Sequence, residues 1–412
     1  MKILYMSHPQ MDTGGVLLFM GLCEVLGPEN IVTFPPVKMF YGITDDHKGP
    51  YTEFLRQAVK SEPLPQGIPP FAPGEDVING WPDAFDLPYL VSQTTELYRE
   101  YKEDEIVAQI KAGAFSFIVL TSGHRINTIA LARLRDKLGG NLPSIVYLDS
   151  GERDEMNEHW THVFQPKIIF KSVLTPEVYN YAKTKYGWEL HPLPHSSVLV
   201  GKNIKAIFDK LEGDEVYELP PVGSQEEIAR RGTAQHMRQL LEKRIPQYIT
   251  FNGDDKVVDC FYGLGATYDK RRELLDVLHK YFATSYYIGI ERPGLRYFRY
   301  LNMIAHSRTA ISMRGSGRDT TRYWEIPLFK TLLICDGTMG AMHPHPFEHG
   351  KTAVFYEENN LKQVPELLDY YLSHETERRQ IANAGYEHVM KYHTMKARAE
   401  YFLDIVRQNG VT

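Results

Sequence analysis

Short apolar runs separated by polar, glycine-rich loops recur along most of the chain. The first run, Lys2–Met6, is followed by a loop and then by an apolar stretch with helical character, Val16–Leu26. Apolar runs of this length predict buried strands, and their alternation with helical patterns predicts parallel α/β units. Further runs expected to form strands are Phe115–Thr121, Ser144–Leu148, Lys167–Lys171, Val257–Tyr262, Ser285–Ile290, Thr309–Met313, Thr331–Cys335 and Ala353–Phe355.

Helical patterns follow the strands of the second half in the same rhythm. A strand, a glycine turn and a helix form the usual first unit of a Rossmann-like domain, and this succession occurs near the start of each half. The sequence therefore predicts the α/β class with two Rossmann-like domains. The expected helices of the second half are Lys270–Tyr281, Leu295–His306, Leu361–Leu372, Glu375–Tyr392 and Met395–Gln408.

Two stretches interrupt this rhythm and suggest where the domains divide. Residues 35–90 are dense in proline and glycine but contain aromatic side chains, which favours a packed insertion over a free linker. Residues 200–250 are charged and irregular, as expected of a connection between domains. A chain of 412 residues also exceeds what one core usually organises. We expect an N-terminal domain over 1–245, a C-terminal domain over 246–394 and a final helical segment over 395–412.

Charge and cysteine usage narrow the class of protein. The net charge is −6 and the pI is near 6.3, so no overall field attracts the chain to nucleic acid or anionic lipid. The three cysteines are scattered within or beside apolar runs, as buried thiols in a reducing compartment would be. MKILYM is a short strand and not a signal sequence, and no apolar run reaches spanning length, so we expect a cytoplasmic protein.

The segment after the run Thr309–Met313 has the composition of an anion-binding loop. Glycines let the backbone approach a ligand, and the free N–H groups at the helix start that follows can face phosphates. Arginines add charge and paired hydrogen bonds to a diphosphate, and a carboxylate one turn into the helix can hold the vicinal hydroxyls of a ribose. The implied ligand is a nucleotide sugar. The residues concerned are Arg314, Gly315, Gly317, Arg318, Thr320, Thr321, Arg322 and Glu325, with Gly263 and Gly265 as a second candidate phosphate-facing turn.

Structural explanations compete with this reading. Glycine loops and charged helix starts are common in α/β proteins, and Asp319 is a good helix N-cap. Gly263 and Gly265 fit a tight strand–helix turn equally well. Arg271 and Arg272 lie at the start of a helix, where acidic residues are usually preferred, so either a nearby anion or solvent exposure would explain them.

At this point the sequence resembles a known family. GRDTTRYWEIPLFKTLLICD is similar to the donor-binding segment of nucleotide-sugar glycosyltransferases with the GT-B fold, in particular the group related to the spore-maturation protein CgeB. FEHGKTAVFY, the segment that follows it, and VVDCFYGLGATYDKRRELLDVL extend the resemblance over about residues 255–405. It implies two Rossmann-like domains facing a cleft, a C-terminal donor domain resembling glycosyl transferases group 1, and a last helix that crosses back onto the N-terminal domain. It also implies a UDP-sugar co-substrate, no other cofactor and no bound metal.

Two positions depart from the family pattern. Many retaining members carry two glutamates eight positions apart, and Glu325 matches the second, but Gly317 stands where the first would be. Members usually carry a glycine five residues after the second glutamate, where this chain has Lys330. The donor domain is still expected, but the stereochemical outcome does not follow.

The catalytic base is expected beyond the carboxyl ends of the N-terminal strands, where ligands bind in open parallel sheets. An inverting transfer needs such a base to accept the proton of the attacking hydroxyl. The candidates are the marginally preferred Glu152 and Asp149, then His124, and finally His8 and Asp12, which follow the first strand. Each one alone also suits a plain loop hydrogen bond. His343, His345 and His349 are interrupted by prolines and lack a cysteine or carboxylate pattern, so no metal site is expected.

The resulting prediction is a glycosyltransferase that moves a sugar from a nucleotide-sugar donor to an unidentified acceptor hydroxyl. The alternative is a non-catalytic nucleotide-sugar-binding protein, which the missing glutamate favours weakly. The acceptor stays open among polysaccharide, protein, small molecule and modified phage-type DNA. DNA would require a basic stripe, and Arg125, Arg133, Arg135 and Lys137 would not share one helical face. An oxidoreductase is disfavoured because the Gly-x-Gly-x-x-Gly fingerprint is absent.

Overall fold

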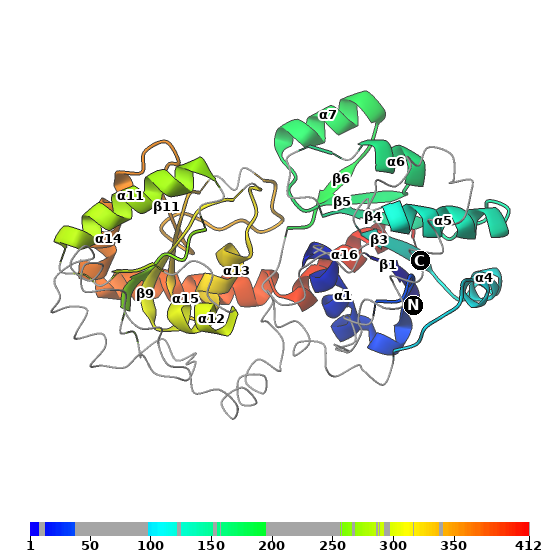
Figure 1. Ribbon diagram of the computed structural model, residues 1–412, viewed down its shortest axis with the longest axis horizontal. Coiled ribbons are helices and arrows are strands. Elements are labelled where there is room, and N and C mark those ends of the chain that lie inside the picture. The colour runs from blue at the N-terminus through cyan, green and yellow to red at the C-terminus, as the bar shows by residue number, and fades with distance from the viewer. Residues whose placement is uncertain are drawn as a thin grey trace, which may run out of the picture. The chain divides into compact units, whose positions relative to one another are not determined.

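The chain divides into two compact units in the computed structural model (Figure 1). The first unit comprises Met1–Ser196 and Met395–Thr412, and the second comprises Ser197–Thr394. The structure describes residues 1–7, 13–37, 98–121, 125–150, 155–156, 158–194, 256, 258–265, 268–285, 287, 289–291, 297–315, 317–337 and 341–411. Most of the predicted insertion over 35–90 lies outside these residues. So does all of the predicted connection over 200–250, which contains the predicted domain boundary at 245/246.

The first unit is built on a parallel sheet of six strands in the order β2-β1-β3-β4-β5-β6. Its strands are nearly continuous apolar runs because helices cover both faces of the sheet. The register pairs Leu4 of β1 with Val32 of β2 and with Ile118 of β3. The strands are β1 (Ile3–Met6), β2 (Ile31–Thr33), β3 (Phe117–Thr121), β4 (Ile145–Asp149), β5 (Ile168–Lys171) and β6 (Leu190–Pro192).

Two helices cover one face of this sheet, and four helices pack on the other. Helices α1 (Thr13–Leu26) and α16 (Met395–Gln408) pack against each other and against the first face (Figure 1). A Cβ added to Gly21 of α1 would lie 2.2 Å from the carbonyl oxygen of Met395. A glycine is therefore what lets α16 pack so closely here. The other face carries α4 (Glu103–Lys111), α5 (Arg125–Lys137), α6 (Glu158–Phe164) and α7 (Pro176–Tyr186), and a short 3₁₀ turn, η1 (Pro28–Asn30), precedes β2.

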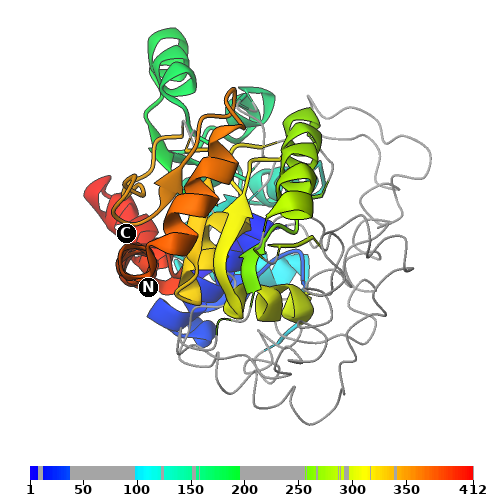
Figure 2. The ribbon, with the colours of Figure 1, turned by 90° about the vertical axis from the view of Figure 1, so that its left-hand side faces the viewer.

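The second unit contains a parallel sheet of five strands in the order β11-β10-β9-β7-β8 (Figure 2). Helices α11, α14 and α15 contribute to a core on one face of this sheet. Its strands are β7 (Val258–Phe261), β8 (Gly289–Ile290), β9 (Ser307–Ser312), β10 (Leu332–Cys335) and β11 (Val354–Phe355). Its helices are α11 (Asp269–Thr284), α12 (Tyr297–Ala305), α13 (Thr321–Leu328), α14 (Gln363–Ser373) and α15 (Glu375–Tyr392).

The two sheets share one strand order. In each sheet, the first strand lies between the second and the third. The chain therefore moves along the sheet in one direction to form the second strand and in the opposite direction to form the third. The point where the direction changes lies between β1 and β3 in the first sheet and between β7 and β9 in the second. Such a switch point opens a crevice at the carboxyl ends of the strands, and open α/β sheets bind ligands there. The predicted α/β class with parallel sheets is confirmed, whereas a cleft between the units stays a prediction.

A partly buried lysine lies at the amino edge of the second sheet. The ammonium group of Lys256, just before β7, donates to the carbonyl oxygens of Ala305 and Phe329 at 2.7 and 2.8 Å, and to Oγ1 of Thr331 at 2.8 Å. Burial, followed by the positive charges of Arg378 and Lys330, lowers the pKa of Lys256 to about 7. Because Phe329 ends α13, these bonds hold the far end of the helix whose start faces the candidate site.

Candidate functional site

Two predicted loops flank the switch point of the second sheet. The turn containing Gly263 and Gly265 follows β7, and the segment from Met313 onward follows β9. Phe261 of β7 pairs with Ala310 of β9, so both loops leave the same edge of the sheet side by side. The fold therefore brings together the two glycine loops that the sequence marked as candidate phosphate-binding segments.

Arg271 of α11 ties these two loops to each other. Its guanidinium donates to the carbonyl oxygens of Arg314 at 2.8 Å, Met313 at 2.7 Å and Gly265 at 3.3 Å. A Cβ added to Gly315 would lie 3.3 Å from Nη2 of Arg271, so a larger residue would crowd this brace. Arg271 is only 5% exposed. Solvent exposure therefore does not explain Arg271, and it holds the site's backbone in place.

Its sequence neighbour, Arg272, lies in solvent and makes a different contact. Arg272 is exposed and pairs with Asp269 one turn earlier at 3.0 Å. An exposed pair of this kind contributes little to stability. Of the two adjacent arginines, only the first belongs to the candidate site.

A second guanidinium, that of Arg322 in α13, lies close to Arg271. Burial, and then the positive charge of Arg322, lower the pKa of Arg271 to about 10. Nη1 of Arg322 is buried and has no hydrogen-bond partner among the described residues. Two like charges and an unused donor at one sheet edge are the arrangement that a bound anion would stabilise.

The start of α13 faces the same edge without a side-chain cap. Thr320 is the N-cap residue and has extended backbone angles, and its side chain makes no capping hydrogen bond. Asp319, which the sequence offered as the N-cap, precedes that position, and its carboxylate accepts a hydrogen bond from Nε1 of the buried Trp324 at 3.1 Å. The positive end of the helix dipole at this edge favours anionic ligands.

Glu325 lies one turn into α13 and is only 1% exposed. The hydroxyl of Tyr300 in α12 donates to its carboxylate at 3.0 Å. Burial, and then the negative charge of Glu325, raise the pKa of Tyr300 well above its usual value, and nearby Arg322 opposes that rise. Tyr300 therefore keeps its proton and orients the Glu325 carboxylate. Nothing in the sequence pattern singled out Tyr300.

Arg314, predicted to contact a diphosphate, is engaged by side chains. Its Nε donates to Glu358 at 3.2 Å, its Nη2 donates to the hydroxyl of Tyr268 at 2.8 Å, and its guanidinium lies over the Tyr268 ring. The backbone N–H of Arg314 donates to the carboxylate of Asp336 at 3.0 Å. Arg271 and Arg322 are therefore better placed than Arg314 to supply positive charge at the helix start. The contribution of Arg318 to donor binding stays a prediction.

Asp336 directly follows β10 and accepts a hydrogen bond from the backbone of the candidate site. Its carboxylate is buried and also accepts a hydrogen bond from the Tyr323 hydroxyl at 2.5 Å. Burial raises the pKa of Asp336 above its usual value. Gly337 follows with φ of +55°, and an added Cβ would lie 2.7 Å from that of Phe355. Sequence reasoning marked Asp336-Gly337 only as the end of a strand and missed this buried anchor.

The two departures from the family pattern have different structural settings. Gly317 is buried in the loop before α13 and brings no carboxylate to the site. Lys330 follows α13 with φ of +52°, in the left-handed region that favours glycine. The chain therefore keeps a backbone conformation typical of glycine at this position while carrying a lysine.

The first unit places one predicted base at the carboxyl edge of its sheet. Asp149 ends β4, and its carboxylate pairs with the ammonium of Lys171 at the end of β5, 3.3 Å away. Lys171 is fully buried, so the pair is shielded from water. The other four candidate bases, Glu152, His124, His8 and Asp12, lie outside the described residues.

Polar side chains also gather at the β1–β3 switch point. Thr121 donates to Ser7 at 2.7 Å, and the amide of Asn127 donates to the Thr121 carbonyl at 3.1 Å. Oδ1 of Asn127 and Oγ of Ser172 are buried and, among the described residues, have no hydrogen-bond partner. The first unit therefore has unused hydrogen-bonding capacity near Asp149, where a polar ligand could bind.

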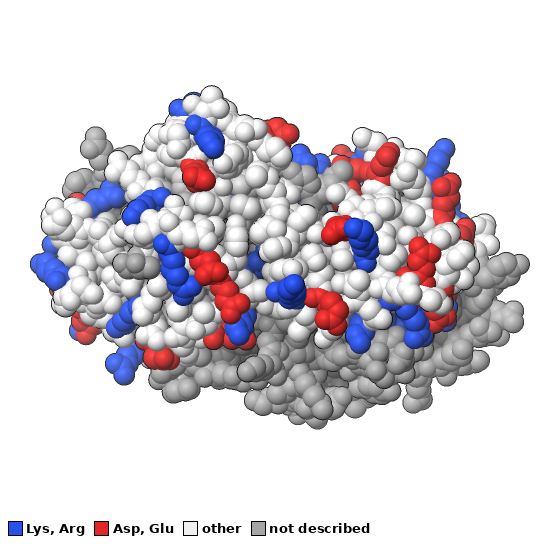
Figure 3. All heavy atoms as spheres, turned by 180° about the vertical axis from the view of Figure 1, so that it is seen from behind, with Lys and Arg blue, Asp and Glu red and all other residues white. Residues whose placement is uncertain are grey.

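Three of the four basic residues considered for DNA binding are engaged within the first unit, and the side chain of the fourth, Arg125, lies outside the description. Arg133 pairs with Glu103 at 2.8 Å, and Lys137 pairs with Glu103 at 2.7 Å and with Asp104 at 2.6 Å. Arg135 donates to backbone carbonyls of α6. On the face of the molecule in Figure 3, basic and acidic side chains are interspersed. Arg133, Arg135 and Lys137 thus do not supply a stripe of uncompensated positive charge.

The three histidines considered as metal ligands each contact a different partner. His343 packs against Trp324, His345 stacks on Tyr392, and Nδ1 of His349 accepts a hydrogen bond from a backbone N–H. In the part of the chain that the structure describes, no group of three or more histidine, cysteine, aspartate or glutamate side chains could hold a metal ion. Over the same residues, no helix is both long and apolar enough to cross a membrane.

Part of the chain matches a known protein family. Residues 270–404 match the family described as Glycosyl transferase-like. The match begins in α11, includes α13, whose start forms part of the candidate site, and ends in α16. No curated protein matches the chain.

Solved structures with similar backbones include two that are named as glycosyltransferases and one protein solved with UDP and glucose. A Rickettsia africae glycosyltransferase is 12% identical at a TM-score of 0.48, over 99% of this chain and 98% of the other. Anabaena HepE with UDP and glucose is 10% identical at 0.46, over 99% and 100%. An α-glucosyltransferase with UDP and a 13-mer DNA is 10% identical at 0.48, over 99% of both chains. At such scores these likenesses decide neither donor nor acceptor.

Proposed function

We propose that the protein is a glycosyltransferase that binds a nucleotide-diphosphate sugar, with a UDP-sugar expected, at the switch point of its second sheet. The glycosyl transferase-like domain and the cluster around α13 support this proposal together. The observation that carries it is the proximity of Arg271 and Arg322 at the start of α13, with Glu325 one turn further along. The resemblance to the CgeB-related group belongs to the same proposal.

The residues suit the charge that develops during sugar transfer. An acceptor hydroxyl attacks the anomeric carbon, the bond from that carbon to the diphosphate breaks, and the electron pair leaves with the diphosphate. Arg322 and the N–H groups near Thr321 would stabilise the growing negative charge, with Arg271 holding both loops. Glu325 would bind the ribose hydroxyls. Since arginines and helix N–H groups supply the positive charge, we propose a transfer that needs no bound metal.

The first unit would bind the acceptor at its own switch point. The hydroxyl proton would pass to one of the candidate bases, and Glu152 and Asp149 remain our preferred pair. Asp149 lies at the carboxyl edge of the first sheet, where its carboxylate pairs with Lys171. Cys260 and Cys335 are buried free thiols, which fits the reducing cytoplasm.

A non-catalytic nucleotide-sugar-binding protein is the second candidate. Gly317 favours it, because the loop before α13 lacks the carboxylate that many retaining members have there. Turnover separates the two functions. A binding protein would hold the donor without breaking its sugar–phosphate bond.

The test is UDP release from a panel of UDP-sugars, measured with and without hydroxyl-bearing acceptors alongside UDP binding. We expect the protein to release UDP from at least one donor, by transfer or by slow hydrolysis. An Arg272→Ala variant should behave like the parent, because Arg272 lies outside the site. UDP binding without release from any donor would assign the non-catalytic function, and neither binding nor release would contradict both.

A further inference from the structure

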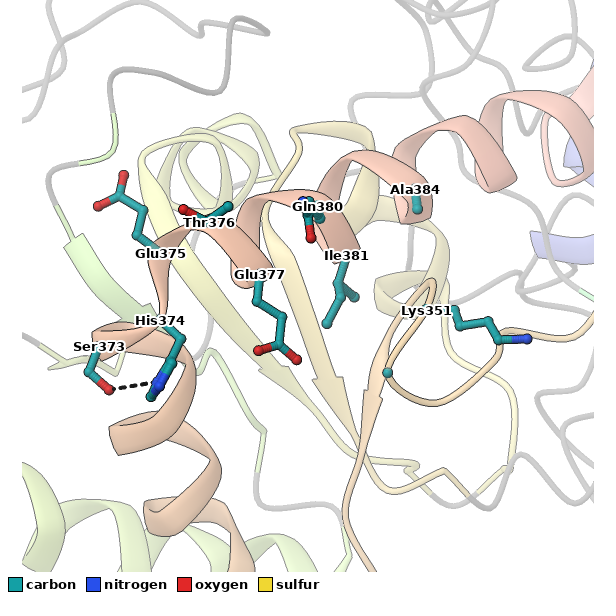
Figure 4. A pocket seen from close by; sticks show the side chains of 10 residues that line it. Lys351, Ser373, His374, Glu375, Thr376, Glu377, Gln380, Ile381 and Ala384 are labelled. Atoms are coloured by element: carbon teal, nitrogen blue, oxygen red, sulfur yellow. Dashed lines mark hydrogen bonds between the residues drawn. The ribbon is translucent and has the colours of Figure 1, made fainter.

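An open groove of about 950 Å³ lies on the second unit, between the start of α15 and the loop before β11 (Figure 4). Glu377 and Ile381 point from α15 into the space beside this loop, whereas Glu375 points away. Its volume lies at the upper end of the range for small-ligand sites, about 300–1,000 Å³. The lining residues that matter here are Lys351, His374, Thr376, Glu377, Gln380 and Ile381.

The groove is separate from the candidate donor site. Strand β11 runs parallel to β10, so Lys351, which precedes β11, lies at the amino edge of the sheet. Helix α14 returns from the carboxyl edge, and the turn into α15 at His374 reaches the amino edge as well. The donor loops leave the opposite, carboxyl edge, so a ligand in the groove would not occupy the donor site.

Local contacts occupy the charged groups around the groove. Lys351 pairs with Glu348 at 2.6 Å, and Glu375 pairs with Arg379 at 2.8 Å. The carboxylate of Glu377 accepts a hydrogen bond from the Tyr370 hydroxyl at 2.8 Å. Lys351, the lysine in the lining, is paired and so offers a phosphate little positive charge, and the described residues hold no group of side chains that could bind a metal ion. The groove therefore suits a neutral ligand.

Two kinds of lining surface remain for such a ligand. The side chains of Thr376 and Gln380 form no hydrogen bond with the described residues, so a hydroxyl group and an amide are available. His374 stacks on Tyr370 with centroids 4.1 Å apart and planes 16° apart, and Tyr370 is 44% exposed. Hydroxyl partners beside flat apolar surfaces match the alternating polar and apolar faces of a sugar ring.

We propose that this groove binds a neutral oligosaccharide, whose hydroxyls bond to Thr376, Glu377 and Gln380 and whose apolar face packs on the ring of His374. The site would hold a sugar chain away from the point of transfer. The inference goes beyond the proposed transfer reaction, since binding in the groove requires neither donor nor turnover.

The test is saturation-transfer NMR of the full chain with maltohexaose, cellohexaose, chitohexaose and mannohexaose, with UDP present throughout. At least one of these should bind, and Gln380→Ala and His374→Ala should each weaken it about tenfold, the effect of losing one contact. Asn383→Ala, an exposed amide on α15 that does not line the groove, is the matched control and should leave affinity unchanged.

Several results would overturn this assignment. They are no binding by any of the four oligosaccharides, equal affinity for the parent and Gln380→Ala, and tighter binding of a sulfated oligosaccharide, which contradicts a neutral site. Donor binding is measured separately with UDP alone, so a failure of the proposed transferase function would be recognised independently.

Discussion

Arginines that look equivalent in the sequence have distinct environments in the fold. Arg271 is buried against three carbonyls, whereas the adjacent Arg272 is paired in solvent. Arg314 is held by Tyr268 and Glu358, whereas Nη1 of Arg322 lacks a partner among the described residues. Composition predicted an anion site but could not rank these side chains. Their partners come from other strands and helices, so only the fold decides which donors remain available.

Lys330 allows a direct test of backbone strain. Its left-handed backbone conformation costs a non-glycine residue about 1 kcal/mol. Its ammonium also lies 5.4 Å from the centre of the Tyr386 ring, so removing the side chain changes a second contact. The informative comparison is therefore between Lys330→Gly and Lys330→Ala, which both lose that contact.

We expect Lys330→Gly to be more stable than Lys330→Ala by about 1 kcal/mol in urea unfolding, since only glycine adopts this conformation without steric cost. Equal stabilities, or a more stable alanine variant, would show that position 330 is not strained. The family pattern of a glycine here was visible in the sequence. The reason for it, a positive φ after α13, was not.

Helices and strands were predicted well where the apolar pattern was long. The sequence gives α15 and α16 their observed bounds, and β1, β9 and β10 lie within two residues of the predicted runs. The three-residue strands β2 and β6 were not predicted, because so few residues carry no clear periodicity. Strand order depends on contacts between distant segments, so neither switch point could be derived from the sequence pattern.

The packing of α1 against α16 predicts that Gly21→Ala lowers the stability of the fold, whereas helix propensity alone would predict a gain. Alanine normally stabilises a helix by about 1 kcal/mol relative to glycine. In Gly21→Ala, however, the new methyl group would meet the carbonyl oxygen of Met395 and force the two helices apart. Overpacking of this kind costs about 1–3 kcal/mol, so we expect a net loss of stability.

Urea unfolding followed by circular dichroism measures this balance. We expect a lower unfolding midpoint for Gly21→Ala than for the parent. A midpoint raised as propensity predicts would show that α16 does not lie this close to α1. The sequence suggested that a last helix joins the N-terminal domain only through a family resemblance, and it gave no sign of the glycine contact.

The two units repeat one topology, and each gathers polar groups at the switch point of its sheet. In the second unit these are arginines and a helix start, which suit an anion. In the first, Ser7, Thr121 and Asn127 lie at the switch point, and Asp149, Lys171 and Ser172 follow further along the same edge, at the ends of β4 and β5. Such groups suit a polar acceptor. Sequence reasoning identified most of the second set because it is contiguous from 314 to 325. The first set is spread over several strands and α5, so only Asp149 was named.

The central claim is that the switch point of the second unit binds a nucleotide-diphosphate sugar through Arg322. Calorimetric titration of the full chain with UDP and UDP-sugars tests it most directly, with Arg322→Ala and Arg272→Ala compared under identical conditions. Arg322→Ala should weaken binding about 10- to 100-fold, the effect of losing a charged hydrogen bond, while Arg272→Ala should stay within about twofold of the parent. A folded Arg322→Ala variant that binds UDP as tightly as the parent would contradict the account.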